Sequence, residues 1–271
     1  MRRIANCLVI LVASCALAPK ITRLNMTTWS IAALDPDSGD VGVAVASCVP
    51  DAHVDAVAAL VPGVGVAVTQ AVWILDNRNR VYEALRAGLS AEEVIERVAD
   101  ADIDANLARR QYGAVTLSDG EIRIAGFTGQ GADAWSGIRF DLDMAVSVQG
   151  NTLLGEAVVA DALAAFLANA ADGKNTLADR LLRGLEAGSA AGGDVRCNQD
   201  GISSTAATAA ILLARGGDPP YAAQTIRMTD QGTAAAPWLS ISEAGPAEGP
   251  NPILEVRRRY EEWRQAIPEG D

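Results

Sequence analysis

Short apolar runs separated by glycine, proline and aspartate recur along the chain, a pattern typical of β-hairpins. The clearest turn is Asp119-Gly120, because an Asp-Gly pair between alternating apolar residues favours a tight hairpin. The Asp, Pro and Gly residues at 35–40 predict a longer turn. Applied to the whole chain, the pattern predicts strands at residues 27–34, 41–48, 63–70, 112–117, 121–127, 144–149, 204–214, 224–228 and 238–241.

Helical periodicity separates these strands into groups. Ser90 with Glu93 has the spacing of a capping box, and Gly88 suits the end of the preceding helix. Hairpin-linked strands predominate and helices come in pairs, which predicts an α+β fold of two mostly antiparallel sheets with helices outside, rather than a doubly wound parallel sheet. The strand beginning near Thr28 is expected to be central. We predict helices at residues 80–89, from 90 onward, near 105–110, and at 155–170, 175–187 and 252–265.

The first 25 residues differ from the rest of the chain. Arg2 and Arg3, followed by an apolar run at 7–13 and a box ending at Cys15, resemble a short bacterial leader with a lipoprotein-type cleavage site. The run is too short to predict a spanning helix. Residues 1–25 are therefore either a signal peptide or a mis-assigned gene start upstream of Met26. No linker or charge block divides residues 26–271, which predicts a single domain.

Charge and composition exclude several classes of function. The formal net charge is −12 although the leader is basic, so we expect the domain to repel nucleic acid and anionic membranes. His53 is the one histidine of the chain, and Lys20 and Lys174 are its lysines, so multi-histidine metal sites and lysine-based phosphate loops are not available. We expect no metal and no cofactor. A lipid anchor at Cys15 is the one route to a membrane, and homo-oligomer formation stays open.

The cysteines bear on localisation. Cys7 and Cys15 lie in the leader, which leaves Cys48 and Cys197 in the domain. An exported domain with two cysteines favours a Cys48–Cys197 disulfide, whereas a cytoplasmic protein would hold two free thiols. We expect export to a periplasmic, secreted or lipid-anchored location. Translation from Met26 would instead leave the protein in the cytoplasm.

Hydroxyl side chains crowd the start of the first predicted strand. Thr27 and Thr28 could be nucleophiles activated by a free α-amine, whose unperturbed pKa near 8 suits proton abstraction. The alternative is that these residues only reflect strand propensity. Catalysis requires one threonine to be the first residue of the chain. Starting at Met26 gives this after removal of the initiator, whereas export through Cys15 demands a second cut.

Other polar residues at strand ends are candidates for the same site. Asn151, after a predicted strand, could donate to an oxyanion, although Gly-Asn is also common in turns. Asp194 and Arg196 could form a structural ion pair or orient a substrate carboxylate. The remaining candidates for substrate binding are Ser30, Ser47, Gln70 and Gln149.

The order of several short motifs resembles one family. These motifs are Thr28-Trp29-Ser30-Ile31, residues 42–47, residues 65–70, Gln111-Tyr112-Gly113, Phe127-Thr128-Gly129, Trp135-Ser136-Gly137, Val148-Gln149-Gly150-Asn151, Gly192-Gly193-Asp194 with Arg196, and residues 252–255. Together they are similar to the uncharacterised Ntn-hydrolase-like family called domain of unknown function 1028. The resemblance implies a four-layer αββα sandwich and, through the N-terminal nucleophile hydrolases, hydrolysis of amide bonds.

The sequence thus predicts an N-terminal-nucleophile amidohydrolase for a small amide or peptide-like substrate. The alternative is a non-catalytic binding or assembly module with the same fold. An exposed α-amine would distinguish them, because an uncleaved leader would block the base.

Overall fold

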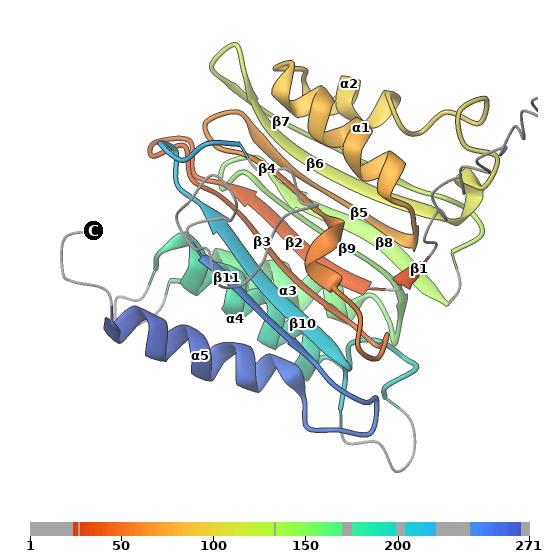
Figure 1. Cartoon of the computed structure of the whole chain (residues 1–271), viewed down its shortest axis with the longest axis vertical. Helices are drawn as coiled ribbons and strands as arrows, with labels where there is room; N and C mark the ends of the chain where they lie inside the picture. The colour runs from red at the N-terminus through yellow and green to blue at the C-terminus, as the bar shows by residue number, and fades with distance from the viewer. Residues whose placement is uncertain are drawn as a thin grey trace, which may run out of the picture.

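The computed structural model describes residues 24–26, 28–132, 134–169, 175–198, 204–220 and 239–266, with the backbone alone for 24–26. Two antiparallel sheets stack face to face (Figure 1). Sheet A has the strand order β1-β5-β6-β7, with β4 also paired to β5, and sheet B has the order β11-β10-β3-β2-β9-β8. The strands are β1 (Leu24–Met26), β2 (Thr28–Leu34), β3 (Val41–Ser47), β4 (Ala58–Val61), β5 (Gly65–Trp73), β6 (Arg110–Ser118), β7 (Glu121–Thr128), β8 (Trp135–Asp141), β9 (Val146–Leu153), β10 (Thr208–Ala214) and β11 (Leu239–Ala244).

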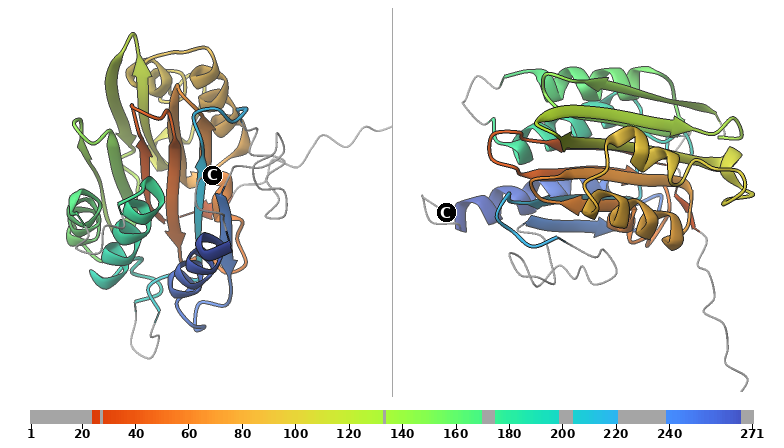
Figure 2. Two further views of the ribbon diagram at one scale, coloured as in Figure 1. Left: turned by 90° about the vertical axis from the view of Figure 1, so that its left-hand side faces the viewer. Right: turned by 90° about the horizontal axis from the view of Figure 1, so that it is seen from above.

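Helices cover the outer face of each sheet (Figures 1 and 2). The helices α1 (Leu75–Arg86) and α2 (Ala91–Glu96) pack on sheet A. The helices α3 (Ala157–Leu167), α4 (Leu177–Ala190) and α5 (Pro252–Ala266) pack on sheet B. Two short 3-10 helices, η1 (Val54–Val57) and η2 (Leu107–Arg109), lie in connections. The predicted αββα sandwich of mostly antiparallel sheets is confirmed.

The alternation of side chains along β2 explains its central position. Trp29, Ile31 and Ala33 belong to the core between sheet B and its helices, whereas Ala32 and Leu34 belong to the core between the two sheets. All seven residues of β2 are buried, as expected for a strand covered on both faces. Its neighbours are β3 and β9, so the predicted central position is also confirmed.

Local signals fix several ends of these elements. Ser90 accepts from the backbone of Glu93 and Glu93 accepts from that of Ser90, which completes the predicted capping box of α2. Thr176 caps α4 in the same way. At the β6–β7 hairpin, Asp119 and Gly120 have φ values of 53° and 79°, the left-handed pair that a tight hairpin turn requires.

The structure differs from the sequence prediction in a few elements. Helix α1 begins at Leu75, whereas we predicted its start at residue 80. The predicted start was too late because polar residues that are buried in the first turns of the helix interrupt the apolar stripe. Strands β1, β4 and β8 were not predicted, and the helix predicted near 105–110 is only the 3-10 helix η2. Strand β9 continues to Leu153, beyond the predicted end at 149. The strand predicted at 224–228 lies outside the described residues.

Candidate functional site

The candidate site lies where the central strand β2 begins. Thr28 is the first residue of β2 and pairs with Ser47, the last residue of β3. On the other side, Trp29 pairs with Gly150, so the antiparallel register places Asn151 of β9 beside Thr28. Thr28, Ser47 and Asn151 are each at most 1 % exposed. Polar residues therefore flank the start of β2 on both neighbouring strands.

Five buried polar side chains join the two sheets next to Thr28. Ser30 Oγ donates to Gln70 Oε1 at 2.7 Å, and Gln149 Nε2 donates to Ser30 Oγ at 2.7 Å. Gln70 Nε2 and Asn151 Nδ2 both donate to Gln111 Oε1, at 2.7 and 3.0 Å. No member is more than 1 % exposed. We call this set, Ser30, Gln70, Gln111, Gln149 and Asn151, the inter-sheet polar cluster.

Gly113 makes room for the inter-sheet polar cluster. It lies in β6 two residues after Gln111, and a Cβ atom at this position would lie 2.1 Å from Gln149 Oε1. That oxygen accepts from Ser147 Oγ at 2.8 Å. A side chain at residue 113 would therefore displace the amide that holds Ser30. The lack of space for a Cβ atom explains why residue 113 is a glycine.

The cluster contacts the backbone of Thr28 and leaves one acceptor unfilled. The Thr28 carbonyl accepts from Gln70 Nε2 at 3.3 Å. Asn151 directs Nδ2 toward Gln111, and its Oδ1 is buried without a hydrogen-bond partner. A buried acceptor without a donor is unfavourable. The unfilled acceptor lies at the register position beside Thr28.

The strand that precedes Thr28 in the sequence, β1, belongs to sheet A rather than to sheet B. Strand β1 pairs with β5, with Met26 opposite Ala71, whereas β2 lies in sheet B. The backbone therefore passes from one sheet to the other between Met26 and Thr28. Thr27 itself lies outside the described residues. Because residues precede Thr28, its nitrogen is part of a peptide bond in this chain.

A disulfide and an ion pair hold the loop that follows β3. Cys48 and Cys197 form the predicted disulfide, with a Cα–Cα distance of 5.6 Å. Asp194 Oδ2 accepts from the backbone nitrogen of Cys48 at 3.2 Å and from Arg196 Nη2 at 2.7 Å, and Arg196 Nε donates to Asp194 Oδ1 at 3.0 Å. The Asp194 carboxylate is completely buried. It therefore fixes the backbone directly after Ser47.

A second buried network surrounds the start of β6. Arg110 Nε donates to Asp104 Oδ2 at 2.6 Å, and Asn77 Nδ2 donates to the same oxygen at 2.8 Å and to Tyr112 Oη at 2.6 Å. Burial alone would raise the pKa of Asp104, but the hydrogen bonds from Arg110, Asn106 and Asn77 lower it to about 2. Burial raises the pKa of Tyr112. The network joins α1 to β6 and keeps Asp104 ionised.

The structure brings most of the predicted site residues together. Ser30, Gln70, Gln149 and Asn151 belong to the inter-sheet polar cluster, and Ser47 lies beside Thr28. Asp194 and Arg196 form the ion pair beside Cys48 rather than part of the cluster. Thr27 lies outside the described residues. His53 is exposed, and it belongs to neither network.

Gln111 is the functional candidate that sequence reasoning missed. It accepts from two members of the cluster, and its Nε2 donates to the Gly150 carbonyl at 2.8 Å. Its signal in the sequence was a long polar side chain directly before the apolar run of β6. Only the stacking of the two sheets reveals that this side chain meets β2 and β9.

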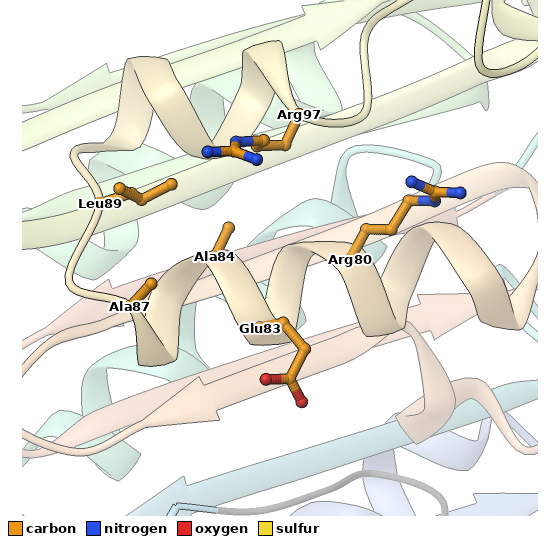
Figure 3. Close-up of a pocket in the computed structure, with 6 residues that line it drawn as sticks. All are labelled: Arg80, Glu83, Ala84, Ala87, Leu89 and Arg97. Atoms are coloured by element: carbon orange, nitrogen blue, oxygen red, sulfur yellow. The ribbon is translucent and has the colours of Figure 1, made fainter.

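Three hollows lined by described residues lie away from the cluster. One of about 280 Å³ lies between α1 and α2 (Figure 3), where Arg80 and Arg97 border an apolar floor that includes Ala84 and Leu89. A second, of about 260 Å³, includes Asp35, which follows the far end of β2. A third, of about 390 Å³, is lined mainly by residues 243–252 and by Ala207, which packs with the two cysteines of the disulfide.

Two observations concern metals and membranes. Within the described ranges, no group of three histidine, cysteine, aspartate or glutamate residues could hold a metal ion. None of the helices in the same ranges has the length and apolar character needed to cross a bilayer.

The fold and the site define a layered αββα protein with a buried polar cluster at the start of its central strand. The chain belongs to the family of unknown function DUF1028, whose model matches residues 28–236. It is also similar to the crystal structure of a Silicibacter pomeroyi protein described as a DUF1028 member, with 21 % identity, a TM-score of 0.64, and coverage of 90 % of this chain and 91 % of that chain. At this identity the likeness shows the fold alone. No curated protein matches the chain significantly.

Proposed function

We propose that this protein is an N-terminal-nucleophile amidohydrolase that acts on a small amide or peptide-like substrate, with Thr28 or Thr27 as the first residue of its active form. The observation that carries the proposal is the position of Thr28, at the start of the central strand beside Ser47 and Asn151. The inter-sheet polar cluster supports it, because hydrogen bonds fix the surroundings of Thr28 before any substrate binds.

The chemistry needs only groups of this chain and water. The free α-amine takes the proton of the threonine hydroxyl as the oxygen attacks the amide carbonyl. The protonated amine then gives this proton to the leaving nitrogen as the C–N bond breaks, which leaves an acyl ester on threonine. Water, activated by the same amine, hydrolyses the ester and restores the hydroxyl.

Asn151 suits a role at the amine. Its Nδ2 binds Gln111, whereas its unfilled Oδ1 can accept an N–H. A hydrogen bond from a freed α-amine to this oxygen would orient the lone pair of the amine toward the hydroxyl. The role that we predicted from the sequence, donation to an oxyanion, would instead need the second hydrogen of Nδ2.

Activity requires a chain that is cut before a threonine. Translation from Met26 and removal of the initiator would expose Thr27, while export would need leader cleavage and a further cut. The Cys48–Cys197 disulfide is compatible with export, so we propose an exported protein whose active form arises by a second cleavage.

Mass spectrometry of the native protein tests the first requirement, because it gives the N-terminal residue. Hydrolysis is then measured as amine release from a panel of N-acyl amino acids, dipeptides and primary amides. We expect Thr28→Ala or Thr27→Ala to abolish turnover, depending on which residue is first. The corresponding change to serine should retain part of it, because serine keeps the hydroxyl.

The matched control is Thr116→Val in sheet A, where the threonine is also fully buried. It should leave turnover unchanged. Turnover that survives both alanine substitutions in a correctly processed protein would rule out the mechanism.

A second candidate function is a non-catalytic binding or assembly module. The observation that favours it is that the cluster is at most 1 % exposed and that none of its members lines the three hollows described above. A native protein that still carries residues before Thr27 and releases no amine from any substrate would support this candidate.

A further inference from the structure

The short strand β1 pairs with the end of one edge of β5. The two strands are antiparallel, with Leu24 opposite Trp73 and Met26 opposite Ala71 (Figure 1). Strand β4 pairs with the same side of β5 only as far as Val68, and β6 lies on the opposite side. Among the described strands, β1 is therefore the only one that pairs with this side of β5 between Ala71 and Trp73.

This part of β5 begins directly at the inter-sheet polar cluster. Gln70, the residue before Ala71, donates through Nε2 to the Thr28 carbonyl at 3.3 Å. Met26, opposite Ala71, is joined to Thr28 by a single residue. Residues 24–26 are on the acyl side of the bond before either candidate threonine. Strand β1 therefore shows where the acyl side of a peptide bond at this position lies.

Contacts that do not involve β1 hold the end of β5 in place. Arg110 Nη1 donates to the Val72 carbonyl, and Arg110 is itself bound by Asp104. Ala71 pairs with Arg110 of β6 as well as with β1. The side chain of Trp73 belongs to the core between the two sheets. Because these contacts remain when β1 is removed, the edge would keep its shape and present unpaired backbone groups.

We propose that the β5 edge between Ala71 and Trp73 binds the acyl side of a peptide substrate as an extended antiparallel strand, in the place that β1 occupies in the uncut chain. This inference rests on the proposed function, because cleavage before a threonine separates β1 from the domain and opens the edge. Backbone hydrogen bonds to a sheet edge bind extended peptides. The substrate is therefore a peptide with several residues before the bond that is cut, and β1 blocks its binding until cleavage.

Binding to the edge is tested on the full chain with its disulfide intact, so the test does not depend on processing. The combined changes Leu24→Pro, Asn25→Pro and Met26→Pro remove the backbone donors of β1 and open the edge. The probe is the capped tripeptide acetyl-Leu-Asn-Met-amide, and its control is the same peptide methylated on its backbone nitrogens. Nitrogen-15 NMR of the tryptophan-labelled protein follows the backbone amide of Trp73, which is identified by its absence from Trp73→Phe.

We expect the tripeptide to shift the Trp73 resonance of the proline variant in a saturable way. The methylated peptide should bind about tenfold more weakly or less, since it cannot donate to β5. The unmodified chain should show no saturable shift, because β1 occupies the edge. If the proline variant does not fold, a chain translated from Met26 replaces it, because removal of the initiator leaves that chain without β1.

Trp135 is the internal control for peptide binding at other edges. It begins β8, the edge strand of sheet B, and its amide resonance, identified by Trp135→Phe, should not shift. Three results would overturn the proposal: no saturable shift at Trp73 with the edge open, equal binding of the two peptides, or a shift at Trp135 alone.

Hydrolysis separates a failure of this inference from a failure of the proposed function. On protein that begins at a threonine, acetyl-Leu-Asn-Met and acetyl-Met are compared as amides of the same fluorescent amine. We expect kcat/KM to be about tenfold higher or more for the longer peptide, and methylation of its backbone nitrogens should remove this advantage. Equal turnover of the two amides would overturn the inference and leave the proposed function intact. Binding at Trp73 without hydrolysis of either amide would support the peptide site and contradict the proposed function.

Discussion

Replacing Gln111 by leucine tests whether the inter-sheet polar cluster stabilises the fold. The substitution keeps a side chain of similar size but removes the acceptor of Gln70 Nε2 and Asn151 Nδ2 and the donor to the Gly150 carbonyl. Gln70 Nε2 keeps the carbonyl of Thr28 at 3.3 Å. Within the described part of the chain, Asn151 Nδ2 has no other hydrogen-bond acceptor. Gln111→Leu thus leaves the Nδ2 donor of Asn151 unpaired, and it removes one hydrogen bond each from Gln70 Nε2, Thr128 Oγ1 and the carbonyls of Gly137 and Gly150.

The magnitude follows from this count. A buried polar atom that loses its partner costs about 1–3 kcal/mol, so we expect Gln111→Leu to reduce the free energy of unfolding by about 2–5 kcal/mol. Adding Asn151→Leu should recover part of this loss, because the unpaired donor is then absent. The two single variants and the double variant form a cycle that isolates the interaction between Gln111 and Asn151.

Urea denaturation measures these differences, followed by circular dichroism and tryptophan fluorescence with the disulfide intact. Gln130→Leu is the control, because Gln130 is exposed, and its free energy of unfolding should change by less than about 0.5 kcal/mol. A Gln111→Leu protein as stable as the control would refute the argument that these hydrogen bonds hold the two sheets together.

Three further predictions concern other parts of the structure. Removing the disulfide by Cys48→Ser with Cys197→Ser should lower the free energy of unfolding by about 2–5 kcal/mol in urea denaturation, since the bridge closes a loop of 149 residues, and an unchanged stability would contradict this. The pKa of Asp104 is about 2 in the folded protein and about 3.9 in the unfolded chain. The ionised carboxylate therefore contributes its full stabilisation of the fold above about pH 3.9, and this contribution is lost as the pH falls toward 2. In Asp104→Asn, the free energy of unfolding should depend less on pH in this range, as measured by acid denaturation. Gly113→Ala should lower the thermal midpoint, because its Cβ would lie 2.1 Å from an amide oxygen of the cluster and overpacking costs about 1–3 kcal/mol; a midpoint equal to that of the unmodified protein would show that the cluster can shift.

Much of the fold could be predicted because its signals are local. The Asp119-Gly120 turn and the Ser90–Glu93 capping box each depend on residues that are close in sequence, and both were located correctly. Strand β8 was missed because it is a half-exposed edge strand containing Gly137 and a register shift. Helix α1 was shortened because Asn77 and Arg78 are polar yet buried, and periodicity treats such residues as solvent-facing.

The site could be predicted only in part, because sequence does not show which strands face one another. Ser30, Gln70 and Asn151 were identified as polar residues near strand ends. Their joint contact with Gln111 follows from the stacking of two sheets, which no local pattern encodes.

The composition of the inter-sheet polar cluster has a consequence for folding. Its members come from β2, β5, β6 and β9, so the contacts of Ser30 span 40 residues to Gln70 and 119 residues to Gln149. Contacts with such separations form slowly, since each requires the closure of a long loop before it contributes any energy. Only a chain synthesised and folded at least through β9 can complete the cluster. A shorter nascent chain contains Thr28 but lacks the strand that places Asn151 beside it.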